Sequence, residues 1–254
     1  LEFHSVSRRF GPTVALEELS FTVPATSIWG FVGRNGAGKT TAMRIALGLL
    51  APDAGHVHWR GAAIGAETRG RIGYMPEERG LYPKMRIGDQ LSYLARLHGY
   101  DQAAADEATA LWLERLGLSE RSSDRVEALS LGNQQRVQLG AALVHSPELL
   151  ILDEPFSGLD PVAVDVLSTI LRERVRDGGA TVLFSSHQLD LVERLCDGVT
   201  IIDSGQLVAA GTVTDLRRGD GARRFHLTVD ADLNWAARPG LRVVHSEGDD
   251  VVIE

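Results

Sequence analysis

Short apolar runs separated by turn residues fill the first part of the chain and predict strands. The first 28 residues alternate apolar stretches with turn residues, and one stretch ends at Pro24, which favours short antiparallel strands. Residues 28–32 form a compact apolar run that stops at a glycine, as expected of a buried strand. Residues 40–50 then predict a helix, and residues 56–64 predict a pair of strands.

Helical periodicity dominates the middle of the chain. Leucine and alanine recur at three- and four-residue spacing over residues 87–119, with breaks at Gly99 and Gly117, which predicts a helical block. The elements predicted after this block are helices over 133–144, over 162–176 and up to Cys196, buried strands over 149–152 and 181–184, and a hairpin over 199–202 and 207–209. This alternation of strands and helices predicts an α/β fold.

The pattern changes after Asp215. The segment 217–221 has the composition of a linker, and three short strands are predicted beyond it, over 225–229, 241–244 and 251–253. We therefore predict a main domain over 1–214 and a small C-terminal extension over 215–254, short enough to be an incomplete unit.

Composition and charge exclude several classes of protein. Of the 254 residues, 44% are apolar and 24% are charged, which is typical of a soluble globular protein. The net charge of −8 argues against a protein that mainly binds DNA or RNA, because neutralising phosphates needs a basic surface. No run of 18 apolar residues and no signal peptide is visible, so we expect that the chain itself does not cross a membrane. A single cysteine, Cys196, suits a reducing compartment.

A phosphate-binding pattern, G-x-x-x-x-G-K-[ST], spans residues 33–40, between a predicted strand and a predicted helix. Its glycines let successive backbone N–H groups curl around an anion, and the helix N-terminus that follows favours negative charge. Lys39, one of only two lysines, supplies charge for the β- and γ-phosphates, and the Thr40 hydroxyl can ligate Mg²⁺. The ATP-binding residues predicted in this segment are Gly33, Asn35, Gly36, Gly38, Lys39, Thr40 and Thr41.

Two acidic residues follow the buried strand over 149–152. A strand beside the phosphate loop would deliver Asp153 to the Mg²⁺ ligand shell. Glu154 would then stand near the γ-phosphate, where it could orient and activate a water molecule. An Asp-Glu pair is common at the end of a strand, so the assignment depends on the phosphate loop.

Further motifs occur in an order that resembles the ATP-binding subunits of ATP-binding-cassette (ABC) transporters, over about residues 1–214. Residues 129–133, Leu-Ser-Leu-Gly-Asn, resemble the family's L-S-G-G-Q signature. Residues 157–160 match its D-loop, and His187 matches its switch histidine after the third buried strand. Phe10 matches the aromatic residue that stacks on adenine.

The resemblance implies a RecA-like P-loop ATPase core with an antiparallel β layer and a helical subdomain over about 80–145. It also implies that two subunits bind head to tail and sandwich two ATP molecules. Ser130 and Gly132 would meet the γ-phosphate held by the other subunit, His187 would report the γ-phosphate, and Asp160 would link the two sites across the interface.

Each of these residues also has a structural interpretation. Ser130 could be a simple helix N-cap, and His187 could belong to a helix start that Ser185 and Ser186 cap. Phe10 could belong to the core.

The chain departs from the family pattern at two places. The signature carries Leu131 and Asn133 where glycine and glutamine are usual, but it keeps Ser130 and Gly132. The Q-loop carries Glu77 where glutamine is usual. A carboxylate can ligate Mg²⁺ as an amide oxygen can, although Glu77 could also belong to a solvated acidic loop.

The variant residues in the Q-loop and the signature resemble those of the ATPase subunits of bacterial exporters for drugs, sodium or similar solutes. The resemblance implies ATP hydrolysis with Mg²⁺ on the cytoplasmic face of the inner membrane, powering export through a separate permease, with a second copy of the chain or a homologous ATPase as partner. Tyr82, Met85 and Tyr93 would lie near the permease or inside the helical subdomain. The alternatives are a DNA-repair or translation ABC ATPase and a cassette that no longer hydrolyses ATP; no nucleic-acid partner is expected.

The remaining candidates carry less chemistry. His56 and His58 point to one side of a predicted strand and could hold a metal, but the sequence offers no third ligand near them. Trp29 and Trp59 are predicted to lie in the core, and Trp112 could face either way.

Overall fold

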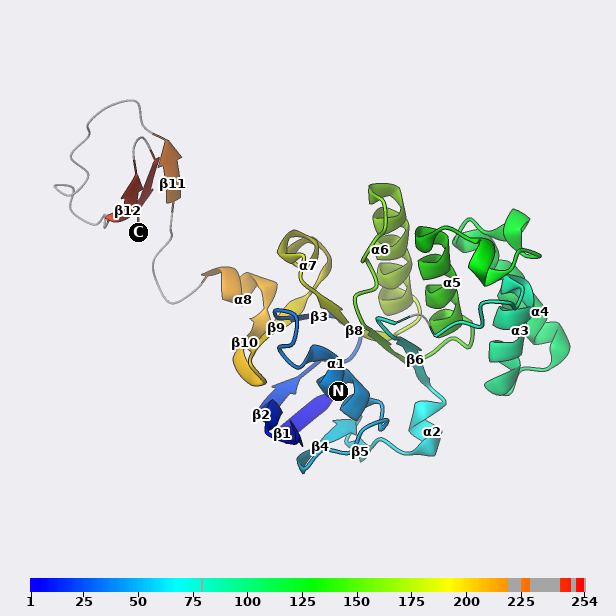
Figure 1. The fold of residues 1–254 in the computed structure, drawn as a ribbon, viewed down its shortest axis with the longest axis horizontal. Helices are drawn as coiled ribbons and strands as arrows, with labels where there is room; N and C mark the ends of the chain where they lie inside the picture. Colours follow the sequence, from blue (N-terminus) through cyan, green and yellow to red (C-terminus); the bar gives the residue numbers. More distant parts are fainter. Residues whose placement is uncertain (79, 219–224, 229–242, 248–249, 254) are drawn as a thin grey trace. The chain divides into compact units, whose positions relative to one another are not determined.

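The computed structural model describes residues 1–78, 80–218, 225–228, 243–247 and 250–253. Its contacts divide the chain into two compact units, Leu1–Gly211 and Thr212–Glu254. The functional motifs all belong to the first unit (Figure 1).

A six-stranded sheet forms the centre of the first unit. In spatial order its strands are β10 (Gln206–Thr212), β9 (Gly198–Asp203), β3 (Ile28–Val32), β8 (Thr181–Ser186), β7 (Leu149–Leu152) and β6 (Ile72–Met75). All neighbours from β9 to β6 run parallel. The strands β3, β7 and β8 are buried along their whole length, which explains the continuous apolar sequences of β3 and β7 and the apolar run 182–184 in β8.

One strand lies between the strand that leads into the phosphate loop and the strand that ends at Asp153. The strand beside β3 is β8, and β7 lies one place further away. Because parallel strands end at the same edge of a sheet, the loops that follow β3, β7 and β8 still meet there.

A second, antiparallel sheet confirms the predicted β layer. Its order is β2 (Thr13–Thr22), β1 (Glu2–Phe10), β4 (Ala54–Trp59) and β5 (Ala62–Ala63). Helix α1 (Lys39–Ala46) contacts β2 and β4, and the main core joins this sheet, α1 and the central sheet. The core contains Trp29 and Trp59, as predicted. Helix α1 is shorter than predicted because Gly48, with φ of +66°, ends it.

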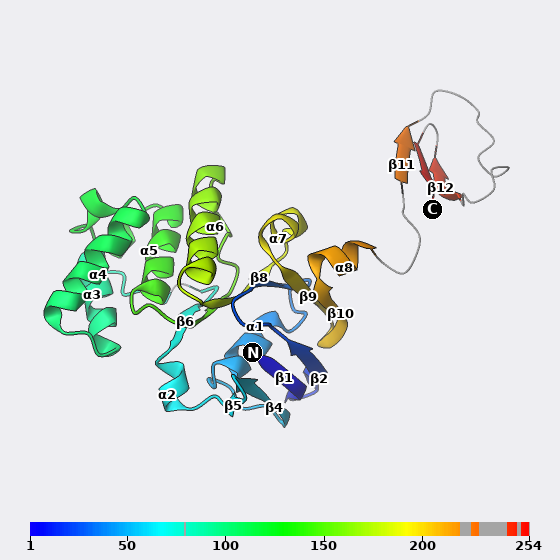
Figure 2. The same ribbon diagram turned by 180° about the vertical axis from the view of Figure 1, so that it is seen from behind.

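Helices cover the other side of the central sheet. Helix α6 (Pro161–Arg176) contacts β3 and β8, and α7 (Leu189–Leu195) contacts β3. The reverse view shows the same layering, with α6 and α7 on one side of the central sheet and the antiparallel sheet on the other (Figure 2). Cys196 caps the end of α7, where burial raises the pKa of its thiol.

The predicted helical block is confirmed and lies at one end of the unit (Figure 1). It contains α3 (Ile87–Leu97), α4 (Gln102–Arg115) and α5 (Leu131–Leu143), with short 3₁₀ turns at Ser119–Arg121 and Val126–Ala128. Helix α5 also contacts β6, where a side chain at Gly73 would meet the Ala142 carbonyl at 2.1 Å. Trp112 is buried within this block. A short helix, α2 (Ala66–Arg69), precedes β6.

The second unit contains α8 (Val213–Arg218) and three paired strands, β11 (Phe225–Thr228), β12 (Val243–Glu247) and β13 (Asp250–Ile253). The predicted linker over 217–221 is wrong at its start, because Arg217 and Arg218 end α8. The Thr212 hydroxyl accepts a hydrogen bond from the Asp215 N–H at 3.1 Å, which favours helix formation there. Residues 219–221 lie outside the described residues, as do parts of two predicted strands, 229 and 241–242.

His145, just after α5, gives the first unit a half-buried group that titrates. Its ring stacks on His98 at 3.6 Å between centroids, and its Nε2 lies 3.2 Å from the Ile72 carbonyl oxygen. Its Nδ1 is buried without a hydrogen-bond partner. Burial lowers the pKa of His145 to about 4, with the His98 ring a smaller cause. The neutral imidazole is therefore the form that the fold stabilises.

We expect His145 to make folding less stable as the pH falls from about 6.5 to about 4. In that range the unfolded chain binds a proton that the folded chain does not. The maximum loss from this residue is about 3 kcal/mol. Urea unfolding at pH 7 and pH 4.5 should show a smaller acid-dependent loss in His145→Gln than in the unsubstituted chain. An equal loss in both chains would contradict the assignment.

Candidate functional site

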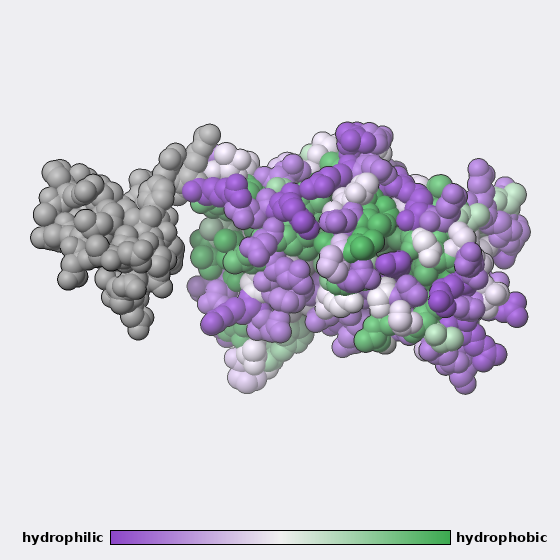
Figure 3. Space-filling view, turned by 90° about the horizontal axis from the view of Figure 1, so that it is seen from above, coloured by the Kyte–Doolittle hydropathy of each residue, from purple (hydrophilic) through white to green (hydrophobic). Residues whose placement is uncertain are grey.

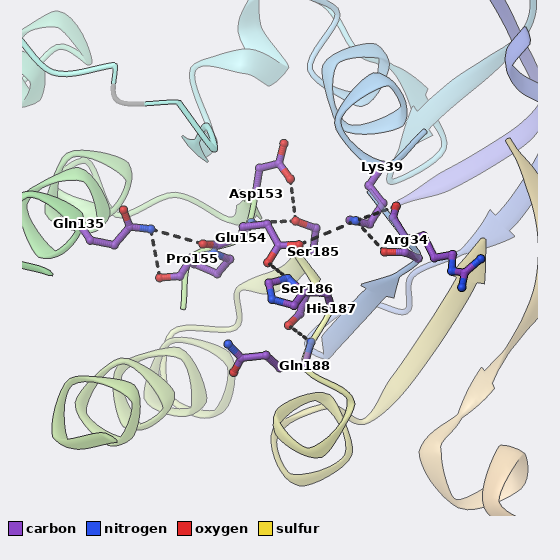
Figure 4. Close-up of polar contacts among 11 residues, drawn as sticks. Arg34, Lys39, Gln135, Asp153, Glu154, Pro155, Ser185, Ser186, His187 and Gln188 are labelled. Carbon is purple, nitrogen blue, oxygen red and sulfur yellow. Dashed lines mark hydrogen bonds and ion pairs between the residues drawn. The ribbon is translucent and has the colours of Figure 1, made fainter. Parts of the chain in front are cut away.

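The phosphate loop joins β3 to α1 in a conformation that glycine permits. Gly36 and Gly38 have φ of +81° and +105°. A side chain at Gly38 would also meet the Ala15 carbonyl oxygen at 2.5 Å. The Lys39 ammonium donates hydrogen bonds to the carbonyls of Gly33 at 2.8 Å and Arg34 at 3.3 Å. The loop thus holds the Lys39 ammonium against its own backbone carbonyls. Figure 4 shows the contact between Lys39 and Arg34.

Asp153 is a buried carboxylate that ties the loop to the central sheet. It accepts a hydrogen bond from the Thr40 hydroxyl at 2.7 Å, and its other oxygen accepts one from Ser185 at 2.6 Å. Only 1% of Asp153 is exposed. The Asp153 charge also contributes to a raised pKa of Tyr74, behind the larger effect of burial.

Glu154 has an unusual backbone that its neighbours hold in place. Its φ of 50° lies in the left-handed region, which costs a residue with a side chain about 1–3 kcal/mol. Its N–H donates to the Ser185 hydroxyl at 2.7 Å, and its carbonyl accepts from Gln135 Nε2 at 3.3 Å and from the Ser157 N–H at 3.1 Å. Strained positions supported in this way cluster at functional sites.

The Glu154 carboxylate lies between two groups that can carry positive charge. Its Oε1 is 3.8 Å from Lys39 Nζ, and its Oε2 is 3.0 Å from His187 Nδ1. A carboxylate only accepts hydrogen bonds, so Nδ1 carries the proton in this pair. Oε1 is buried and has no hydrogen-bond partner, so it can accept one from a bound molecule. Figure 4 shows Lys39, Glu154 and His187 converging at the ends of their elements.

Lys39, Asp153 and Glu154 line one cavity of about 340 Å³, whereas His187 is not among its lining residues. Glu77, the predicted Q-loop residue, comes from the loop after β6 and also lines this cavity. It therefore shares the cavity with the phosphate loop. The residues that line this cavity are Thr13, Val14, Ala15, Asn35, Gly36, Gly38, Lys39, Thr40, Thr41, Glu77, Asp153 and Glu154.

The donor set fits Mg²⁺. Octahedral Mg²⁺ with Mg–O bonds of about 2.1 Å sets neighbouring ligand oxygens about 3 Å apart. The Thr40 and Asp153 oxygens are 2.7 Å apart, and both are the hard oxygen donors that Mg²⁺ prefers. Glu77 and Asp153 add carboxylate charge on the same cavity.

Six predicted residues are not among those that line this cavity: Phe10, Gly33, Ser130, Gly132, Asp160 and His187. Phe10 ends β1 with 48% of its surface exposed and the Arg8 guanidinium 4.9 Å from its ring centre, so the core interpretation is wrong. Ser130 is the N-cap of α5 and accepts from the Asn133 N–H at 3.4 Å. Gly132 follows in the first turn of that helix, and Asp160 caps α6 through the Ala163 N–H at 2.8 Å.

The structure adds Ser185 and Gln135, which the sequence analysis did not assign to the site. The alternative in which Ser185 and Ser186 cap a helix is wrong, because both end β8 and the N-cap of α7 is Gln188. Ser185 instead links Asp153 to Glu154. A serine at the carboxyl end of a buried strand is a signal for such a role, since a buried hydroxyl needs partners.

Known proteins resemble this chain over most of its length. A profile of the family described as ABC transporter matches residues 16–157. The chain is 42% identical over 235 residues to YhaQ, an uncharacterized ABC transporter ATP-binding protein of Bacillus subtilis (strain 168), spanning 92% of this chain and 78% of that protein. It is 36% identical to the linearmycin resistance ATP-binding protein LnrL of the same organism, spanning 100% of this chain and 82% of that protein.

Two further likenesses extend this result. The chain is 36% identical to the Nod factor export ATP-binding protein I of Burkholderia lata, spanning 83% of this chain and 70% of that protein. A solved structure of an ATP-binding subunit of an ABC transporter superposes with a TM-score of 0.79 at 33% identity, covering 85% of this chain and 91% of that one. The fold and family predicted from the motifs are confirmed: the chain belongs to the ABC transporter family, as an ATP-binding subunit whose ATPase activity powers transport.

Proposed function

We propose that the chain powers export of a solute through a separate membrane permease, from the cytoplasmic face of the inner membrane, and that it acts with Mg²⁺ in a head-to-tail dimer. The observation that carries the ATPase part is the set of contacts around Asp153 and Glu154. These contacts join the phosphate loop to Thr40 and Asp153, which we assign as metal ligands, and to Glu154, which we assign as the base.

Each residue has a role that follows from its position. Lys39 and the loop N–H groups bind the β- and γ-phosphates, and Thr40 and Asp153 hold Mg²⁺, which neutralises phosphate charge when bound. Glu154 takes a proton from the attacking water. His187 orients Glu154 through the 3.0 Å contact, and its other ring nitrogen, when protonated, could donate a hydrogen bond to the γ-phosphate.

The proposed dimer would explain four of the residues outside the cavity: Phe10, Ser130, Gly132 and Asp160. Ser130 and Gly132 lie at the exposed N-terminus of a 13-residue helix, where N–H groups favour an anion. One subunit's signature helix would complete the γ-phosphate site of the other. Asp160 would contact the second site, and Phe10 would stack on adenine. The partner is a second copy or a homologous ATPase.

A permease has a candidate docking surface on the helical block. Tyr82 and Tyr93 are 57% and 41% exposed, and their rings meet edge to face at 6.5 Å. Tyr93 and Met85 line a cavity of about 550 Å³ between α3 and α4.

Among the described residues, no helix combines the length and apolar content that crossing a bilayer needs. Figure 3 shows hydrophilic residues over much of one face, with apolar residues in separate patches.

Export is supported by relatives named for Nod factor export and linearmycin resistance. A DNA-repair or translation role is less well supported, because the chain carries a net charge of −8. A cassette that binds ATP without hydrolysing it is disfavoured, because it would not need a carboxylate at residue 154, and here the hydrogen bond to Ser185 helps hold Glu154 in place.

The experiment that tests the function is co-expression with a candidate permease, taken from the membrane proteins encoded in the same genome. We expect the chain and the permease to co-purify. In inverted vesicles, whose outer surface carries the chain, we expect MgATP to drive solute into the vesicle interior. Thr40→Ala should abolish transport without releasing the chain from the membrane. Binding to ribosomes or duplex DNA in place of any membrane protein would contradict the proposal.

Glu77→Gln tests the departure in the Q-loop. Glutamine keeps an oxygen ligand but removes a negative charge from the cavity. We expect a folded chain that still binds MgATP and hydrolyses it at a changed rate, with no inactivation. Mg²⁺ dependence of the ATPase rate is the measurement, and Glu78→Gln is the control. Identical Mg²⁺ profiles for Glu77→Gln and the unsubstituted chain would remove Glu77 from the metal site.

A further inference from the structure

Three histidines gather on the outer face of the antiparallel sheet. They are His4 on β1 and His56 and His58 on β4. Each offers a ring nitrogen, and these three atoms lie within 4.8 Å of one another. His4 and His56 are exposed and His58 is half-buried, so solvent ions reach them. The third ligand that the sequence did not reveal is supplied by a strand distant in the chain.

The strand register explains the cluster. His56 and His58 are two positions apart, so they lie on the same face of β4. His4 pairs directly with His56, and Glu2 pairs with His58. The four side chains therefore form two cross-strand pairs on one face, where directly opposed Cβ atoms are about 5 Å apart. Their inner neighbours, Phe3 and Val57, belong to the core and fix the backbone beneath them.

The imidazoles already lie close to one another. The ring centroids of His4 and His56 are 4.8 Å apart, those of His56 and His58 are 4.4 Å apart, and those of His4 and His58 are 5.7 Å apart. Tetrahedral Zn²⁺ with Zn–N bonds of about 2.1 Å sets its nitrogen ligands roughly 3.4 Å apart. Small rotations of exposed rings reach that spacing without moving the strands.

A carboxylate completes the donor set. Glu2 Oε2 lies 3.3 Å from His4 Nε2. A carboxylate beside a metal-binding histidine fixes its tautomer and raises its basicity, or supplies an oxygen ligand itself. Three imidazoles and a carboxylate suit Zn²⁺ and neighbouring first-row divalent ions, whereas Mg²⁺ and Ca²⁺ prefer oxygen donors alone.

We propose that His4, His56 and His58, with Glu2, form a surface site for a divalent transition metal that ties β1 to β4. The site is separate from the ATP cavity, whose lining includes none of these four residues. Strand β1 also carries Phe10, so a bound metal holds the strand that bears the proposed adenine contact.

The test is Zn²⁺ titration of the nucleotide-free chain by calorimetry, using Zn²⁺ itself as the probe. We expect one saturable site per chain. His56→Gln and His58→Gln should each weaken it at least about 10–100-fold, since loss of a ligand costs at least as much as loss of a supporting hydrogen bond. Glu2→Gln should weaken it about 10-fold. His98→Gln, the same substitution at a histidine outside the cluster, should leave it unchanged.

A second measurement covers the case in which a variant fails to fold. In the unsubstituted chain, a small amount of Cu²⁺ should broaden the NMR signals of the His4, His56 and His58 rings before those of His98. No saturable Zn²⁺ site, or one that survives in the His56→Gln/His58→Gln chain, overturns the proposal. A Zn²⁺ site that survives in the His56→Gln/His58→Gln chain would instead be assigned to the carboxylates of the ATP cavity.

Discussion

Glu154→Gln should keep ATP binding and lower hydrolysis by about 10²–10⁴-fold, the usual loss when a general base is removed. Glutamine preserves the length and shape of the side chain but cannot take a proton from water. The backbone of residue 154 would keep its hydrogen bonds to Ser185, Gln135 and Ser157. Those bonds use only the backbone N–H and carbonyl of residue 154, which the substitution leaves unchanged. Phosphate release at saturating MgATP measures the rate, and fluorescent-nucleotide titration measures binding.

A matched control lies at the other end of the same strand. Glu148 precedes β7, lies on the surface and pairs with Arg60 and Arg71. Glu148→Gln makes the same chemical change away from the cavity, so hydrolysis should stay near its normal rate. If Glu154→Gln also turns over ATP at that rate, Glu154 is not the base.

Two defective chains should restore each other in the proposed dimer. Each composite site takes Lys39 from one chain and Ser130 from the other. Lys39→Ala removes the phosphate cation, and Ser130→Arg blocks the signature helix. A mixed dimer has one site with both lesions and one with none. In the Glu154→Gln background, which slows hydrolysis, the mixture should form an ATP-dependent dimer that neither chain forms alone, detected by sedimentation.

The control places both lesions on one chain. Paired with a chain carrying neither lesion, the Lys39→Ala/Ser130→Arg chain has a defect in each site of every mixed dimer. A tagged double-variant chain should therefore capture no partner with ATP. If the first mixture behaves as the average of its two components, the head-to-tail arrangement is wrong for a homodimer, and a different ATPase subunit becomes the better partner.

The local sequence determined the elements and the family. The buried strands β3, β7 and β8 were predictable because a strand covered on both faces is built largely from apolar residues. The phosphate loop was predictable because its glycine and lysine spacing has few other uses. The roles of Phe10, Ser130, Gly132 and Asp160 remain predictions, because they concern contacts with a second subunit.

Only the tertiary structure decided which distant segments meet. Strand order is set by packing across the whole sheet, so the sequence could not show that β8 separates β3 from β7 or that Ser185 links Asp153 to Glu154. The left-handed backbone of Glu154 is likewise imposed by surrounding hydrogen bonds, since glutamate has no intrinsic preference for it. His4 meets His56 through the register of two strands separated by about 50 residues, and no local pattern encodes that register.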